Sequence, residues 1–220
     1  MRVKTKICGV KSPEALDAAI QGGVAAIGFV FFPPSPRSIT TDTAEQLISR
    51  IPRGILRVAL TVDMDDAELL ALSDRLPLDL LQLHGNETPE RVLEIKKLTG
   101  LPIMKAIKVA EPNDILEADL YSPVAERILF DAKPPKMMKG ALPGGNALSF
   151  NWKWLAGKTL PYPWVLSGGL NSENIQRAIE ISGASFIDVS SGVESTPGVK
   201  DPERIRYFLN IVKDSSPCSC

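Results

Sequence analysis

The stretch KTKICGVKSPEALDAAIQGG, residues 4–23, contains one complete strand-turn-helix unit. Its first four residues form a short run with β-branched side chains, which is typical of a buried strand. Ser12 can cap a helix that begins with Pro13, and the apolar residues that follow recur at the spacing of one helix face. Gly22 and Gly23 then end the helical pattern. The stretch therefore predicts a strand followed by a helix that packs against it.

The same unit recurs along the whole chain. Thr88 and Pro89 repeat the start of the helix, and so do Asp201 and Pro202. Eight short apolar runs are candidate strands: 4–7, 26–30, 56–62, 80–83, 103–107, 127–130, 164–167 and 185–189. Apolar strands that alternate with amphipathic helices predict a parallel sheet covered by helices. Eight such units in 220 residues fit a single (β/α)8 TIM barrel, and an open doubly wound sheet is the alternative.

Composition and charge narrow the class of protein. The chain has 44% hydrophobic residues and a formal net charge of -1, so it lacks the positive charge typical of proteins that bind nucleic acid or anionic membranes. Its longest apolar stretch, 24–32, is too short to span a bilayer, and the first residues lead into no signal-like segment. We expect a cytoplasmic protein with one barrel domain over residues 1–213 and a flexible C-terminal tail over 214–220.

The cysteines indicate reduced thiols. Cys8, Cys218 and Cys220 do not form the disulfide framework that small secreted domains use. Cys218 and Cys220 lie in the polar tail without metal-binding partners nearby, and the sequence predicts no metal site.

In a barrel, the residues at the carboxyl ends of the strands meet around one mouth. Cys8 ends the first predicted strand, His84 follows the fourth and Asp131 follows the sixth. The loops after the seventh and eighth strands contribute Gly168, Gly169, Ser190, Ser191 and Gly192. Glycine and serine there let backbone N–H groups approach a phosphate at a helix N-terminus. Either turn alone could be an ordinary tight turn, but two of them after adjacent strands favour phosphate binding.

Four side chains have competing interpretations. Arg37 lies in a proline-rich loop and could clamp a carboxylate with two parallel hydrogen bonds, or it could be an ordinary solvated arginine. Asp131 could cap a helix, but the residues that follow it do not start one. Cys8 could be an inert buried residue or, facing a carboxyl group across the mouth, one half of an acid-base pair. We interpret His84 as a local hydrogen-bonding residue.

Short motifs in a fixed order connect these residues. They cover residues 6–9, 28–31, 35–37, 82–85, 130–133, 166–170, 188–194 and 197–201. In this order and spacing, the sequence resembles the phosphoribosylanthranilate isomerase family of tryptophan biosynthesis from the first strand to the last helix. Two positions in the loop after the sixth strand depart from the family pattern, because Ala147 stands where a glycine is expected and Asn151 where an aspartate is expected. Residues 59–63, in the third strand, also lack the usual Gly-Val-Phe-Val run of the family.

The resemblance implies an Amadori rearrangement of N-(5-phosphoribosyl)anthranilate to 1-(2-carboxyphenylamino)-1-deoxyribulose 5-phosphate. Asp131 would be the general acid that opens the furanose ring, and Cys8 the general base that removes the proton from C2 of the sugar. Arg37 would hold the anthranilate carboxylate, and the glycine-containing loops would hold the phosphate. No cofactor is required, because the substrate nitrogen becomes the electron sink. A thiol with an ordinary pKa of about 8.5 would be a sufficient base.

Other functions stay open from the sequence. A pentose-phosphate epimerase would need metal-binding histidines, whereas the chain has a single histidine, and an indole-glycerol-phosphate synthase would need a catalytic lysine with acidic partners. The alternative that is not an enzyme is a non-catalytic phosphate-binding barrel of the same fold. Ala147 and Asn151 favour this alternative. The presence of Cys8, Asp131 and Arg37 together argues against it. We expect a small-molecule substrate, no nucleic-acid or membrane partner, and either a monomer or a homodimer.

Overall fold

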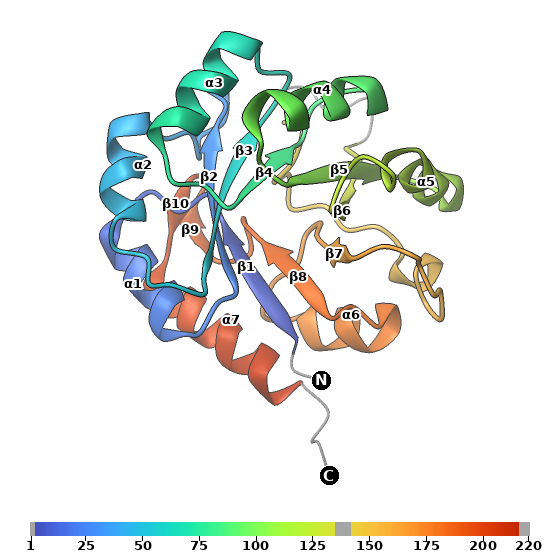
Figure 1. The fold of residues 1–220 in the computed structure, drawn as a ribbon. Helices are drawn as coiled ribbons and strands as arrows, with labels where there is room; N and C mark the ends of the chain where they lie inside the picture. Colours follow the sequence, from blue (N-terminus) through green and yellow to red (C-terminus); the bar gives the residue numbers. More distant parts are fainter. Residues whose placement is uncertain (1–2, 135–141, 216–220) are drawn as a thin grey trace.

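Eight parallel strands close into a barrel in the computed structural model, which describes residues 3–134 and 142–215. The strands are β1 (Lys4–Cys8), β2 (Ala26–Phe31), β3 (Leu56–Thr61), β4 (Leu80–Leu83), β5 (Ile103–Val109), β6 (Arg127–Ala132), β7 (Trp164–Leu166) and β8 (Phe186–Val189). β1 pairs with β2 on one side and with β8 on the other, which closes the ring (Figure 1). The predicted (β/α)8 barrel is therefore confirmed, and the open-sheet alternative is wrong.

Helices cover the outside of the barrel (Figure 1). They are α1 (Pro13–Gln21), α2 (Thr41–Ile48), α3 (Asp66–Arg75), α4 (Pro89–Thr99), α5 (Ala118–Tyr121), α6 (Ile175–Ser182) and α7 (Pro202–Asp214). The side chains of Ser12, Thr88 and Asp201 each accept a hydrogen bond from an amide in the first helical turn, as the sequence predicts. Most of the predicted tail, residues 216–220, lies outside the described residues.

The alternation of strands and helices is interrupted in three places. A 3₁₀ helix, η1 (Pro112–Glu117), precedes α5, and the described residues between β6 and β7 form a loop and a second 3₁₀ helix, η2 (Trp152–Trp154). After β8 the chain forms a hairpin of β9 (Glu194–Thr196) and β10 (Val199–Lys200), whose strands are too short to show a pattern in the sequence. Within residues 3–134 and 142–215, no helix has the length and apolar character needed to cross a membrane.

The barrel interior changes from apolar to polar along the strand direction. Near the amino ends of the strands, side chains form the apolar cluster Ala26, Val58, Leu80, Met104, Ala106, Leu129, Val165 and Phe186. Because strand side chains alternate between the two faces, Lys6 and Cys8 of β1 both point into the barrel beyond this cluster. The polar groups that could carry out chemistry are thus gathered at the carboxyl ends of the strands.

Candidate active site

One pocket at the carboxyl ends of the strands gathers most of the predicted site residues. Its lining includes Cys8, Arg37, Asp131, Gly168, Gly169, Ser190 and Ser191, whereas Gly192 lines an adjacent hollow. Val30, Phe32, Leu60 and Val62 add an apolar wall. In the part of the chain that the structure describes, no group of three or more His, Cys, Asp and Glu side chains is arranged to hold a metal ion.

Cys8, the last residue of β1, lies beside a buried ion pair. Lys6 Nζ donates a hydrogen bond to Asp188 Oδ1 at 2.9 Å, and both side chains are almost fully buried. Gly28 leaves room for the thiol and the ammonium group, since a Cβ atom at this position would lie 2.9 Å from Cys8 Sγ and 3.1 Å from Lys6 Nζ. Burial raises the pKa of the Cys8 thiol, and the positive charge of Lys6 offsets this only in part. The thiol is therefore less acidic than the ordinary thiol assumed from the sequence.

Asp131 lies within β6, one residue before its end, and is buried against His84. Gln82 Nε2 donates to Nδ1 of His84 at 3.0 Å, which leaves the ring proton on Nε2, directed at Asp131 Oδ2 3.1 Å away. The other carboxyl oxygen, Oδ1, accepts a hydrogen bond from the amide of Ala132. The prediction that His84 is a hydrogen-bonding residue is confirmed, and its partner is the carboxyl group of Asp131.

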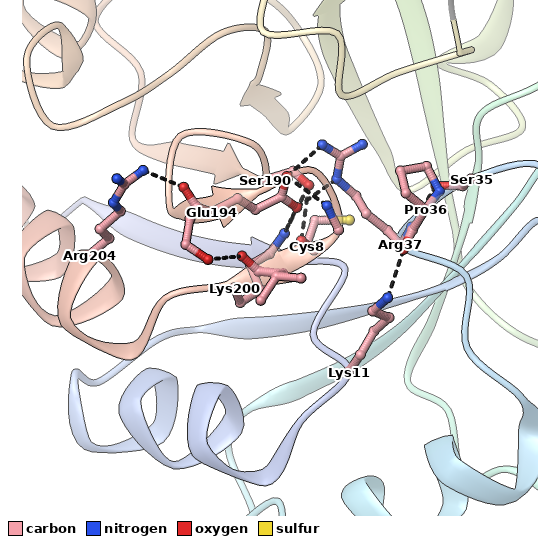
Figure 2. Close-up of polar contacts among 12 residues, drawn as sticks. Cys8, Lys11, Ser35, Pro36, Arg37, Ser190, Glu194, Lys200 and Arg204 are labelled. Atoms are coloured by element: carbon pink, nitrogen blue, oxygen red, sulfur yellow. Dashed lines mark hydrogen bonds and ion pairs between the residues drawn. The ribbon is translucent and has the colours of Figure 1, made fainter.

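Arg37 is buried and ion-paired within the protein (Figure 2). Its Nε and Nη2 atoms each donate a hydrogen bond of 2.8 Å to the carboxylate of Glu194. Lys200 Nζ donates to the same carboxylate at 2.5 Å. Burial disfavours the charged form of Glu194, but the hydrogen bonds from Arg37 and the charge of Lys200 outweigh burial and lower the pKa of the carboxyl group. The solvated-arginine interpretation is therefore wrong.

The glycine-containing turns bring backbone close to backbone. A Cβ atom on Gly169 would lie 2.7 Å from the carbonyl group of Leu148, and one on Gly192 would lie 2.0 Å from the carbonyl oxygen of Leu170. Gly168 and Gly169 also have left-handed φ angles of +90° and +60°. Larger residues would force the loops around the pocket apart, so packing alone is a sufficient reason for these glycines.

The same turns leave backbone N–H groups available to a ligand. Within the described residues, the amides of Gly169 and Ser191 donate no hydrogen bond to the rest of the chain. Neither turn opens directly into a helix, in contrast to the expectation from the sequence, because α6 begins at Ile175 and the loop after β8 leads into the β9–β10 hairpin. The turns themselves, not a helix N-terminus, offer the donors.

Residues 142–146, in the described part of the loop after β6, line the pocket. A Cβ atom on Gly144 would lie 2.7 Å from His84 Nε2 and 2.8 Å from Asp131 Oδ2. One on Gly145 would lie 2.5 Å from Arg37 Nη1. The two glycines let this loop approach both the carboxyl group and the guanidinium group closely.

Comparison with known proteins places this arrangement in a family. Residues 5–211 match the sequence profile described as N-(5'phosphoribosyl)anthranilate (PRA) isomerase. The chain belongs to this family. A relative from Parvibaculum lavamentivorans named N-(5'-phosphoribosyl)anthranilate isomerase is 51% identical over 213 residues, which is 97% of this chain and 99% of the relative.

Solved structures of phosphoribosylanthranilate isomerases have the same fold. The enzyme from Thermotoga maritima superposes with a TM-score of 0.85 and 32% identity, over 96% of this chain and 99% of that chain. Another structure of the family, in complex with reduced 1-(o-carboxyphenylamino)-1-deoxyribulose 5-phosphate, has a TM-score of 0.81 and 31% identity over the same shares of the two chains.

The two loop positions that depart from the phosphoribosylanthranilate isomerase pattern have different consequences. Ala147 has a φ of +57°, a left-handed conformation that favours glycine, so the replacement introduces backbone strain into the loop over the pocket. Asn151 caps η2 through its Oδ1 atom, which accepts a hydrogen bond of 3.2 Å from the amide of Lys153. An aspartate could accept the same bond, so this departure preserves the local structure.

Several polar residues of the site lie within the isomerase motifs, although the sequence predicted no role for them. They are Lys6, Gln82, Asp188, Glu194 and Lys200. A signal was present for the first three, because each is a polar residue inside an apolar strand and shares the strand face of a residue at the mouth. Glu194 and Lys200 had no such signal, since they lie in the short hairpin.

Proposed function

We propose that this member of the family catalyses the Amadori rearrangement of N-(5-phosphoribosyl)anthranilate in tryptophan biosynthesis, with Asp131 as general acid and Cys8 as general base. The observation that carries the proposal is the meeting of the thiol, the carboxyl group and Arg37 in the lining of one pocket. An acid, a base and a cation that face one cavity are what this rearrangement of an anionic substrate requires.

The proposed reaction proceeds in two proton transfers. Asp131 donates a proton to the ring oxygen of the furanose, the bond from that oxygen to C1 breaks, and the anthranilate nitrogen forms a protonated Schiff base with C1. Cys8, as thiolate, then takes the proton from C2, and the electron pair of the C–H bond moves toward the positively charged nitrogen. The resulting enolamine tautomerises to the ketone. The substrate nitrogen acts as the electron sink, and for this reason we expect no cofactor.

The thiolate form of Cys8 needs support inside the barrel. Burial alone disfavours a negative charge on sulfur, whereas the ammonium groups of Lys6 and Lys200 favour it. Asp188 acts in the opposite direction on the thiol while it holds Lys6 in place. We assign to Lys6 the task of stabilising the thiolate as it forms.

Two anionic ends of the substrate would fix its position. We assign the anthranilate carboxylate to Arg37 and the phosphate to the turns that carry Gly168, Gly169 and Ser190–Gly192. Held at both ends, the sugar lies between Cys8 and Asp131, and such positioning can supply about 7–11 kcal/mol of barrier reduction in favourable cases. The ligand named in the related complex carries the same two anionic groups.

The remaining expectations concern organisation and location. We propose a cytoplasmic enzyme in which residues 1–213 form the catalytic barrel. The predicted tail begins at the last residue of α7, Asp214, and its residues 216–220 lie outside the described residues. All groups assigned here come from one chain, so a monomer would have a complete site and a homodimer would have two.

The test is turnover of freshly prepared phosphoribosylanthranilate, followed by the loss of anthranilate-type fluorescence. We expect rapid turnover by the parent protein, and a loss of at least about a hundredfold in both Cys8→Ser and Asp131→Asn. Cys218→Ser serves as the control for cysteine replacement and should leave the rate unchanged. Binding of the product without turnover would instead favour the non-catalytic barrel, and an effect in only one variant would require new assignments of the proton transfers.

A further inference from the structure

Glu194 is a buried carboxylate that two cations share (Figure 2). Its Oε1 atom accepts hydrogen bonds from Arg37 Nε and Lys200 Nζ. Its Oε2 atom accepts from Arg37 Nη2 and from the amide of Gly198 at 3.2 Å. All three charged side chains are at most 7% exposed, so solvent screens their charges little. This network is built from three side chains of the fold itself.

The β9–β10 hairpin holds the network in place. Lys200 and Glu194 are cross-strand partners in the hairpin, and Arg204 of α7 donates to the backbone carbonyl of Glu194. The turn of the hairpin packs against the loop that carries Arg37, because a Cβ atom on Gly198 would lie 2.3 Å from the carbonyl oxygen of Pro36. The hairpin therefore sets the position of Glu194 relative to the guanidinium group.

The hydrogen bonds to Glu194 use only one edge of the guanidinium group. A guanidinium group has five N–H donors, and the edge formed by Nε and Nη2 is occupied. Nη1 donates no hydrogen bond to the described residues, and Arg37 lines the pocket. Gly145 leaves room for the guanidinium group, since a Cβ atom there would lie 2.5 Å from Nη1. The Nη1–Nη2 edge can therefore form a second pair of parallel hydrogen bonds with a carboxylate in the pocket.

The charges of the network do not balance. While Cys8 is the neutral thiol that burial favours, Arg37 and Lys200 carry two positive charges and Glu194 supplies one negative charge, so one positive charge remains in a buried setting. Leaving a buried charge without compensation is unfavourable, and one further anion at the free guanidinium edge would remove the excess. Without Lys200, Glu194 would neutralise Arg37 and leave little attraction for a second carboxylate.

We propose that Lys200 and Glu194 are specificity-determining positioning residues: Glu194 fixes Arg37 by its Nε edge, and Lys200 offsets the charge of Glu194, so that the free edge attracts an aryl carboxylate. The inference rests on the proposed function in one respect, namely that the carboxylate belongs to the anthranilate part of the substrate. Neither residue touches the reacting atoms in this assignment.

The test compares two ligands that differ only in the carboxylate. The first is reduced 1-(2-carboxyphenylamino)-1-deoxyribulose 5-phosphate, and the second is the same compound prepared from aniline, which lacks the carboxylate. Affinities are measured by calorimetry, and the informative quantity is the ratio of the two affinities for each variant. This ratio separates the carboxylate from the phosphate, which both ligands share.

Lys200→Met should reduce the ratio by about tenfold, because the variant loses the positive charge that offsets Glu194 and Glu194 then neutralises Arg37. In the double variant Lys200→Met/Glu194→Gln, the charge of Arg37 is free again, and most of the ratio should return. A merely structural role would not give such a rescue. Lys105→Met is the matched control, since Lys105 is equally buried and bound to Glu87 at 2.7 Å, and it should leave the ratio unchanged.

An unchanged ratio in Lys200→Met, or a further fall in the double variant, would overturn the inference. Turnover of phosphoribosylanthranilate by the parent is measured on the same preparation. If the parent turns over its substrate while the ratio fails to respond, only the assignment of Lys200 and Glu194 is wrong. If the parent neither turns over the substrate nor binds either ligand, the proposed function itself is wrong.

Discussion

Replacing Lys6 by methionine should strongly destabilise the barrel. Methionine has a similar length and fits an apolar interior, so the main change is the loss of the ammonium group. Asp188 would remain as a buried carboxylate without its cation, since the two side chains are 1% and 5% exposed. Removing one partner of a buried ion pair costs about 3–5 kcal/mol.

The structure sets the scale of this effect. At 2.9 Å and an effective dielectric constant of about 20, the attraction between Lys6 and Asp188 is about 6 kcal/mol. The variant loses this attraction, but the loss is partly offset because no ammonium group has to leave water when the methionine is buried. A net loss of about 3–5 kcal/mol is a large part of the 5–15 kcal/mol by which domains are usually stable.

Urea unfolding at pH 7, followed by circular dichroism, measures the free energy of unfolding. The double variant Lys6→Met/Asp188→Asn removes both charges and should regain most of the lost stability. Arg50→Met is the surface control, because Arg50 and Asp17 are about 42% and 44% exposed and their ion pair should contribute less than about 1 kcal/mol. A loss below about 1 kcal/mol in Lys6→Met, or a double variant no more stable than the single one, would show that the buried charge of Asp188 does not depend on Lys6.

Three further predictions concern the pocket. In a variant without the tail cysteines, alkylation of Cys8 by iodoacetamide should rise with pH with a midpoint above that of free cysteine, because burial raises the pKa of the thiol. A midpoint at or below that of free cysteine would contradict this. Gly28→Ala should lower the free energy of unfolding in urea by about 1–3 kcal/mol and slow turnover, because the added methyl group would collide with Cys8 Sγ. Unchanged activity would show that the thiol can move aside. Ala147→Gly should stabilise the protein by about 1 kcal/mol in the same assay by relieving the left-handed φ angle, and a loss of stability would argue against strain.

The sequence predicted the barrel because its signals are local. Each buried parallel strand is a short apolar run, and the caps at Ser12, Thr88 and Asp201 lie next to the helices that they start. The strand ends were predicted less accurately: the sequence predicted a strand over 127–130, whereas β6 extends to Ala132 and so includes Asp131. The segment after β6 lacks the helical period and forms a loop and a 3₁₀ turn in its described part.

The partners within the site could not be read from the sequence. Lys6 and Asp188 are 182 residues apart, and Arg37 and Glu194 are 157 residues apart, so each pair forms only when the barrel closes. A charged residue is usually exposed, and nothing local shows that Arg37 is buried against a carboxylate. The roles of Cys8, Asp131 and the phosphate-binding turns stay predictions that rest on their position and on the family.

A kinetic isotope effect distinguishes the proposed role of Asp131, which opens the ring, from that of Cys8, which removes the proton from C2. The substrate is prepared with deuterium at C2 of the ribose, and its rate is compared with that of the unlabelled substrate in Cys8→Ser and Asp131→Asn. We expect a large primary isotope effect in Cys8→Ser, where proton removal limits the rate, and none in Asp131→Asn, where ring opening limits it. An isotope effect of the same size in both variants, or a large one only in Asp131→Asn, would contradict the assignment.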